Sequence, residues 1–175
     1  MMGSIGAGPR RMALVATTVL AACGGIELGT GSGFQANYFS ARSALEAGKF
    51  SVAVNRYDMM LADAGPLETR LRLEKAHALL RADNYPAAAQ EARVVAAAHR
   101  DSRRAAALAV LGTAEHRMAQ EAMSAGNFSS TTVAHLQQAK AALSEMLSTA
   151  PDLDPLGAMA ERLTMIETSL SNLGG

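Results

Sequence analysis

The sequence predicts an all-α protein built as a short solenoid of helical hairpins, about three of them followed by a C-terminal capping helix. Residues that favour helices, such as alanine and leucine, abound, while aromatic residues make up only 4% of the 175 residues. No run of strictly alternating apolar and polar residues indicates a strand. Glycine and proline break the helical pattern at intervals that suit hairpins, and two of these hairpins repeat one another at an offset of 35 residues.

Seven helices are expected along the chain. Gly48 ends the first and Gly65 ends the second, whereas Pro66 and Pro155 suit the first turns of the third and the seventh. Ser102 is expected to cap the fifth. The expected helices span 35–47, 51–64, 66–82, 83–98 (beginning as a turn), 102–124, 130–149 and 155–173.

The two matching hairpins share small residues in the first helix, a turn, an aromatic residue, and an alanine where the two helices come closest. These positions are Ala41, Gly48, Phe50, Ala53, Tyr57 and Leu61 in the first unit, and Ala76, Leu79, Tyr85, Ala88 and Val95 in the second. The pattern resembles the tetratricopeptide (TPR) repeat. The resemblance covers residues 34–151, closely in the first two units and loosely in the third, and it implies a TPR-like solenoid that binds other proteins.

The third hairpin is expected to be longer than the others. Its matching positions, Gly112 and Ala139, are 27 residues apart, whereas the matching pairs in the first two units are 12 apart. Shared between two helices, the difference adds roughly 11 Å to the hairpin. Its tip would hold Met123, Phe128 and Val133, which either form an exposed docking surface or fold over the end of the solenoid and pack there.

The last helix is expected to cap the solenoid, because a terminal element needs one apolar face and one polar face. A partner-binding amphipathic helix is the alternative. The apolar stripe consists of Leu156, Met159, Leu163, Ile166 and Leu170, and the polar face of Glu161, Arg162, Glu167 and Asn172.

The N-terminus has the pattern of an export segment. Arg10 and Arg11 precede an apolar stretch, 12–22, which is far shorter than the ~20 residues of a membrane-spanning helix. It ends in Leu-Ala-Ala followed by Cys23, the only cysteine of the chain. This motif resembles the lipobox of bacterial lipoproteins. The resemblance implies that Cys23 carries a diacylglycerol and an acyl chain such as palmitate, which anchor the protein to a membrane.

Three parts of the chain follow from these patterns. Residues 1–22 are the expected lipoprotein signal peptide, 23–33 a lipidated glycine-rich tether, and 34–175 the TPR-like helical domain. Gly24, rather than aspartate, follows the cysteine. In lipoproteins this favours the inner leaflet of the outer membrane, facing the periplasm.

Composition argues against several classes of function. The formal net charge is zero, so no basic field indicates nucleic-acid binding. With Cys23 acylated, no thiol remains for disulfides or metal ligands. The histidines are isolated from one another, and no nucleophile motif is present. We therefore expect no enzymatic activity, no metal and no cofactor beyond the lipid on Cys23.

The TPR resemblance also implies a peptide-binding groove, lined by the first helix of each hairpin. Carried over to this chain, the groove residues are Gln35, Tyr38, Arg42 and Glu46, then Arg70, Leu73, His77 and Arg81, and in the third hairpin Thr113, His116 and Arg117. Arginine binds carboxylates in a bidentate manner, so the expected ligand is an acidic peptide or a C-terminal carboxylate. The alternative is a solvated face held by ion pairs along helices, such as Glu68 with Arg72 and Arg70 with Glu74.

These resemblances together predict an outer-membrane TPR lipoprotein that acts as a protein–protein interaction scaffold. Known TPR lipoproteins serve as pilotins for secretins, in pilus assembly, or in outer-membrane protein insertion. An accessory regulator of a periplasmic peptidoglycan enzyme is the alternative. Nothing in the sequence selects the partner or the machinery.

Overall fold

The computed structural model describes residues 31–174, all in helices, turns and short connections. Two single 3₁₀ turns, Gly65–Leu67 and Pro151–Leu153, precede the third and the last helix. None of the helices in this part of the chain is long and apolar enough to cross a membrane. The helices are α1 (Gly31–Glu46), α2 (Phe50–Leu61), α3 (Glu68–Arg81), α4 (Tyr85–Ala98), α5 (Ser102–Ser124), α6 (Ser130–Thr149) and α7 (Ala158–Gly174).

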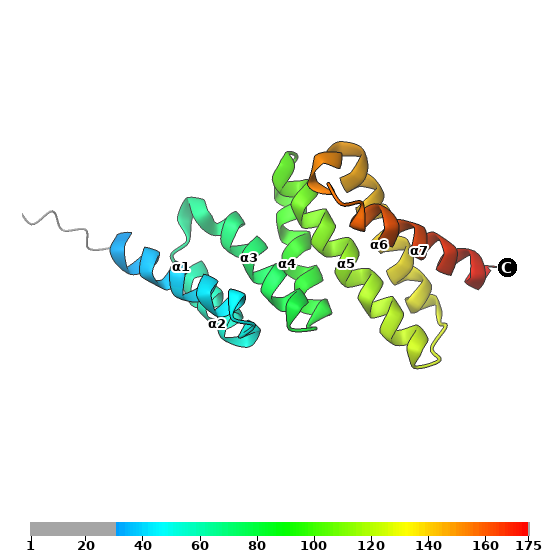
Figure 1. Cartoon of the computed structure of the whole chain (residues 1–175), viewed down its shortest axis with the longest axis horizontal. Helices are drawn as coiled ribbons and strands as arrows, with labels where there is room; N and C mark the ends of the chain where they lie inside the picture. Colours follow the sequence, from blue (N-terminus) through cyan, green and yellow to red (C-terminus); the bar gives the residue numbers. More distant parts are fainter. Residues whose placement is uncertain (1–30, 175) are drawn as a thin grey trace, which may run out of the picture.

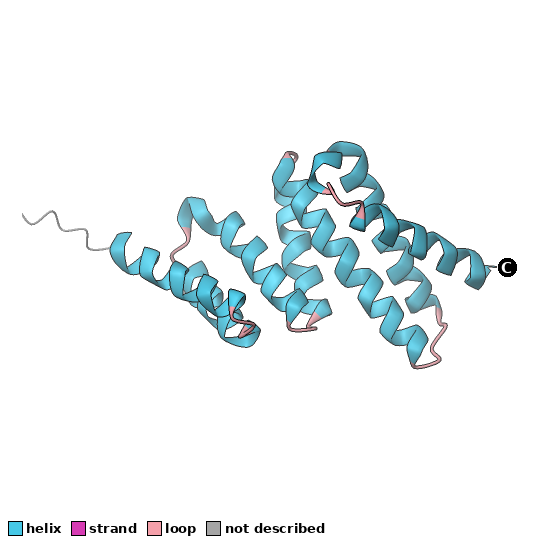
Figure 2. Ribbon diagram, viewed as in Figure 1, coloured by secondary structure: helices cyan, strands magenta, loops and turns pink. Residues whose placement is uncertain are grey.

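The helices pair into three hairpins that follow one another along the long axis of the molecule (Figure 1). Helices α1 and α2, α3 and α4, and α5 and α6 form these hairpins, and α7 lies against the last of them. No strand occurs between residues 31 and 174 (Figure 2). The predicted fold class, a short all-α solenoid of three hairpins with a C-terminal helix, is therefore confirmed. The predicted signal peptide and Cys23 lie outside the described residues.

Small residues let the two helices of each hairpin approach closely. The predicted close-approach positions are all buried: Ala41 and Ala53, Ala76 and Ala88, and Gly112 and Ala139. Helices α5 and α6 approach very closely at Gly112, where an added Cβ atom would stand 2.6 Å from Cγ of Leu143. A larger residue there would push the two longest helices apart.

Several element boundaries differ from the sequence-based expectation: α2 ends at Leu61 and not at 64, and Pro66 lies in the 3₁₀ turn before α3 and not in its first turn. Asp101, rather than Ser102, caps α5, because its side chain accepts a hydrogen bond from the backbone N–H of Arg103 at 3.0 Å. The last helix begins at Ala158 and not at 155, since Asp154 accepts from the backbone N–H groups of Met159 and Ala160. Helix α1 begins at Gly31, inside the segment 23–33 that we expected to be a tether. Phe34 packs against the first core cluster and so anchors the first turns of this helix.

Helix α7 covers the last hairpin with most of its predicted apolar stripe. Ile166 is fully buried, and Met159, Leu163 and Leu170 pack beside it against side chains of α5 and α6. Leu156 was wrongly placed in this stripe, because it precedes the helix and is 93% exposed. The predicted outer face also needs correction: Glu161, Glu167 and Asn172 are exposed, whereas Arg162 is half-buried against α5.

The tip of the third hairpin combines features of both expectations. Phe128 is 60% exposed, whereas Met123 and Val133 are half-buried, and Met123 packs against the cluster around Ile166. The turn is fixed locally, since the Thr132 hydroxyl donates to the carbonyl oxygen of Asn127 at 3.0 Å. Of the two predicted docking residues, Phe128 alone presents a largely open side chain.

Candidate functional site

Two adjoining hollows lie between α1 and the segment that contains η1 (Gly65–Leu67) and α3. We call them together the α1/α3 groove, and Arg70 lines both. The more polar hollow has a volume of about 470 Å³ and is lined by Arg42, Leu45, Arg70, Leu73, Glu74, His77, Leu80 and Arg81. The more apolar one has a volume of about 330 Å³ and is lined by Phe34, Gln35, Tyr38, Leu67, Arg70 and Leu71. Seven of the predicted groove residues thus share one surface: Gln35, Tyr38, Arg42, Arg70, Leu73, His77 and Arg81.

Glu74 is the acidic centre of this groove, and its hydrogen bonds fix the surrounding side chains. It accepts from Nη1 of Arg42 at 3.0 Å and from the hydroxyl of Tyr38 at 3.1 Å. Arg42 also bonds Glu46, and both carboxylates raise the pKa of Arg42. The charge of Arg42 is therefore neutralised within the protein.

Arg70 does not form the ion pair with Glu74 that its spacing along the helix predicted. Its Nη2 instead donates to the hydroxyl of Tyr38 at 2.8 Å, because Arg42 already occupies the Glu74 carboxylate from α1. The other predicted helical pair, Glu68 with Arg72, does form at 2.8 Å. Arg70 therefore keeps its positive charge free of any carboxylate of the described chain.

Arg70, Arg81 and Arg117 share one arrangement, in which each guanidinium lies over an aromatic ring. Such stacking holds an arginine in place while its N–H groups still point outward. None of the three arginines pairs with a carboxylate between residues 31 and 174. The pairs are Arg70 over Tyr38 at 5.0 Å, Arg81 over Phe50 at 5.0 Å and Arg117 over Tyr85 at 5.3 Å, each measured to the ring centroid.

The last two of these pairs repeat with the hairpins. Phe50 and Tyr85 begin the second helix of successive hairpins, and in each case the arginine comes from the first helix of the hairpin that follows. Arg117 also donates from Nη2 to the Tyr85 hydroxyl at 3.0 Å. Arg81 and Arg117, which form no ion pair in the described chain, therefore occupy equivalent positions in successive hairpins.

The groove was predicted to continue over the third hairpin, but it does not, because α7 covers that part of α5. His116 is only 1% exposed, and Nη1 of Arg162 lies 3.2 Å from its Nδ1. The Thr113 hydroxyl contacts the sulfur of Met159 on α7. Burial, together with the charges of Arg162 and Arg117, lowers the pKa of His116 to about 4. His116 is therefore neutral near pH 7, and only Arg117 of this predicted set stays exposed.

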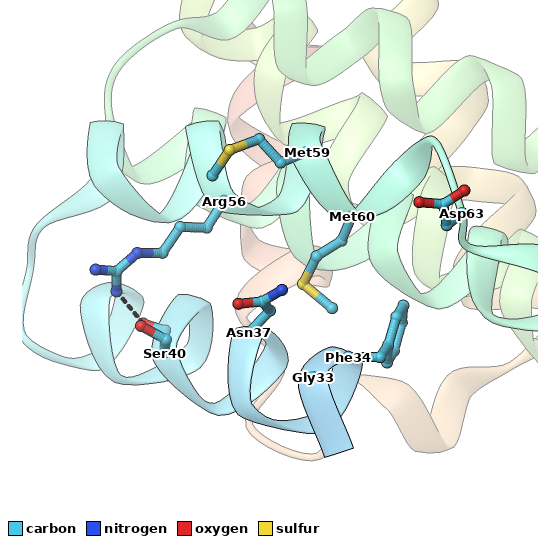
Figure 3. A pocket seen from close by; sticks show the side chains of 8 residues that line it. All are labelled: Gly33, Phe34, Asn37, Ser40, Arg56, Met59, Met60 and Asp63. Atoms are coloured by element: carbon cyan, nitrogen blue, oxygen red, sulfur yellow. Dashed lines mark hydrogen bonds between the residues drawn. The ribbon is translucent and has the colours of Figure 1, made fainter. Parts of the chain in front are cut away.

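A larger hollow of about 910 Å³ lies between α1 and α2, near the first described residues (Figure 3). It mixes polar and apolar side chains, among them Asn37, Met59 and Asp63. Its single cation, Arg56, donates to the backbone carbonyl of Ser40 at 2.6 Å. Arg56 and Asp63 form no ion pair within residues 31–174, and the hollow gathers no set of groups suited to catalysis.

A buried ionic cluster links α4, α5 and α6. Glu115 is fully buried, accepts from Nη2 of Arg93, and lies 2.6 Å from Nδ1 of His135. Because these partners reach its carboxylate from α4 and from α6, Glu115 holds the second and third hairpins together. Elsewhere in residues 31–174, no three histidine or acidic side chains are arranged to hold a metal ion.

Comparison with known proteins adds no relative: no family model, no curated protein and no solved structure matches the chain significantly.

Proposed function

We propose that this protein is a TPR-like lipoprotein of the outer membrane, whose α1/α3 groove binds a peptide segment of a partner protein. In this role it would act as a scaffold for envelope, secretion or pilus assembly machinery. The observation that carries the proposal is the pair Arg70 and Arg81. Both line the same hollow, both are held over aromatic rings, and neither meets a carboxylate of the described chain.

The chemistry of the groove favours an acidic peptide with an adjacent apolar residue. A carboxylate can bind a guanidinium through two parallel hydrogen bonds, which makes Arg70 and Arg81 suitable anchors. Next to Arg70, the more apolar hollow offers Phe34, Leu67 and Leu71 to an apolar side chain. A C-terminal carboxylate that follows an apolar residue would fit both hollows at once.

The spacing of the cations suits an extended ligand. Arg70 and Arg81 are 11 residues apart on α3, which places their backbones about 16 Å apart along the helix axis. An extended chain covers about 3.3 Å per residue, so acidic side chains about five residues apart would meet both arginines. This arrangement favours an extended strand of the partner rather than a helix.

Reversing the charge of Arg70 and Arg81 together is expected to abolish most of the binding. Each charge-assisted hydrogen bond contributes about 1.5–3 kcal/mol, so Arg70→Glu with Arg81→Glu should weaken affinity by about a hundredfold or more. Fluorescence anisotropy measures this with a labelled peptide that ends in Glu-Glu-Leu and carries a free carboxylate.

The matched control reverses two cations outside the groove, Arg100→Glu with Lys140→Glu, and should leave the affinity within about threefold. Circular dichroism confirms that both double variants keep their helices. A second peptide, which ends in amidated Gln-Gln-Leu, lacks the negative charges. The proposal would be contradicted if the wild type bound this neutral peptide equally well. It would also be contradicted if the groove variant bound the acidic peptide as tightly as the control variant does.

The lipid anchor has its own test. Cys23→Ser removes the thiol that would carry the diacylglycerol, and the second acyl chain depends on that first modification. Because stable anchoring takes two or more chains, the variant should move from the membrane to the soluble fraction. Fractionation of cells that express the full chain measures this. If the variant stays with the membranes, Cys23 is not the anchor.

A further inference from the structure

A second basic site lies where α5 meets α7, away from the α1/α3 groove. It consists of His116 and Arg117 on α5 and Arg162 on α7, and we call it the α5/α7 basic site. Nη1 of Arg162 lies 3.2 Å from Nδ1 of His116. A guanidinium can only donate, so Nδ1 accepts and the imidazole proton resides on Nε2. The histidine is therefore a neutral support beneath two permanent cations.

No ion pair within residues 31–174 closes this site, although the hydrogen bond to Tyr85 and the nearby carboxylates of Asp83 and Glu121 raise the pKa of Arg117. Neither Arg117 nor Arg162 forms an ion pair with any residue between 31 and 174. Nε of Arg162 is buried without a hydrogen-bond partner, and so is the side-chain oxygen of Gln120, one turn of α5 beyond His116. Burial and the charge of Arg117 lower the pKa of Arg162.

A half-buried, unpaired guanidinium is costly, since buried charges in proteins are usually paired. A methionine or leucine at position 162 would extend the apolar face that Met159 and Ile166 already form. The position instead carries an arginine, next to a second arginine and to a histidine that accepts its hydrogen bond. Both arginines keep terminal N–H groups that no residue of the described chain engages.

We propose that Arg117 and Arg162 bind a small oxyanion at the α5/α7 basic site, with His116 positioning Arg162. The ligand belongs to the class of carboxylates and similar oxyanions, either free or as an acidic side chain of a partner. The inference goes beyond the peptide groove and does not depend on it. The site also couples ligand binding to the docking of α7, because the two cations come from different helices.

Sulfate is the probe for the test, since it is a divalent oxyanion at every pH at which the protein is studied. Imidazole signals of His116 are followed by NMR at constant ionic strength, with chloride replaced by sulfate. We expect a saturable shift in the full-length wild-type protein. Loss of one charge-assisted partner should weaken the sulfate affinity at least about tenfold in Arg162→Met and in Arg117→Met. Arg100→Met, which removes an exposed arginine elsewhere, should bind like the wild type.

Thermal unfolding separates this account from a purely structural role. Arg162→Met should unfold at a higher temperature than the wild type without sulfate, because it removes a half-buried unpaired charge. Sulfate stabilises folded proteins in general, so it should raise the Tm of both variants slightly and that of the wild type by clearly more. Absence of a saturable His116 shift in the wild type, or equal sulfate affinity in wild type and Arg117→Met, would overturn the proposal; Arg117 is exposed, so that variant is expected to fold.

A competition experiment identifies the source of the oxyanion. The competition uses the double variant Arg70→Glu with Arg81→Glu, in which the groove charge is reversed and the α5/α7 basic site is unchanged. If the Glu-Glu-Leu peptide displaces sulfate from this variant, the site takes a partner's carboxylate. If sulfate remains bound, the site takes a free oxyanion. The use of the groove variant keeps failure of the peptide groove distinct from failure of this site.

Discussion

Tyr57→Ala is expected to destabilise the protein by about 3–5 kcal/mol, because it removes the largest fully buried side chain of the first hairpin. Tyr57 belongs to the core cluster between α1, α2 and α3, and its ring lies 6.5 Å from that of Tyr38. A domain of this size is stable by about 5–15 kcal/mol, so the variant would be close to unfolding at 37 °C. The loss should reach the groove as well, since Tyr38 positions Arg70.

Chemical denaturation measures this change in the free energy of unfolding. Tyr57→Phe is the matched control, because it keeps the ring and loses only the long 3.5 Å contact to Glu74. Burial and the charge of Glu74 raise the pKa of Tyr57, so its hydroxyl stays protonated and this contact is a neutral donor to a carboxylate. The control should cost about 1 kcal/mol or less. A loss below about 1 kcal/mol for Tyr57→Ala would show that the hairpin does not depend on this ring.

Gly112→Val is expected to be the most damaging change in the third hairpin. A Cβ atom at this position would stand 2.6 Å from Cγ of Leu143 and 3.2 Å from the carbonyl oxygen of Ala139. The backbone oxygen cannot turn away as a side chain can, so α5 and α6 must separate. Overpacking of this kind costs about 1–3 kcal/mol or more, and a β-branched residue adds to it because its χ1 cannot adjust.

Gly33→Val provides the matched control, because Gly33 also lies in a helix but a Cβ atom there meets nothing within 4 Å. Replacing glycine by valine at an open helical position stabilises the helix by a few tenths of a kcal/mol, since valine is a weak helix former but a better one than glycine, so about 0.3 kcal/mol is expected. The two variants should therefore shift the Tm in opposite directions. Equal shifts would mean that α5 and α6 can separate at no cost and that Gly112 is not a packing requirement.

Most of the helical architecture could be predicted from the sequence, because local signals specify it. The observed bounds of α5 and α6 agree with the expected 102–124 and 130–149, since Pro151 and the segment at Gly126 leave little choice. Small residues at 12-residue spacing predicted the close approach of helices in the first two hairpins. In the third hairpin, the longer spacing between Gly112 and Ala139 predicted both the close approach and the greater length, and both residues are buried as expected.

Side-chain partners between helices could not be predicted with the same success, because they depend on how each helix is rotated. The pair of Arg70 with Glu74 suited the spacing along α3, but Arg42 from α1 reaches Glu74 first. Arg162 has the polarity of an outer face, yet a small rotation of α7 places it against His116. In both cases the deciding contact comes from a residue more than 30 positions away.

The repeated stacking of arginine on an aromatic ring did leave a signal in the sequence. Phe50 and Tyr85 are 35 residues apart, and Arg81 and Arg117 are 36 apart. Because both offsets are close to one repeat, each arginine could have been predicted to lie over the ring of the preceding hairpin. Comparing the repeats for charged residues, and not only for small and aromatic ones, would have found it.

The most direct test of the central claim, that the α1/α3 groove binds an acidic segment of a partner, is site-specific photo-crosslinking in intact cell envelopes. A photoreactive residue replaces exposed His77 in the groove or, as a control, exposed Gln137 on α6. Mass spectrometry then identifies the attached segment. We predict one dominant partner, crosslinked from position 77 only, through an acidic segment, and lost when Arg70→Glu and Arg81→Glu are added. The same crosslinks from both positions, or crosslinks from position 77 that survive the charge reversal, would contradict the account.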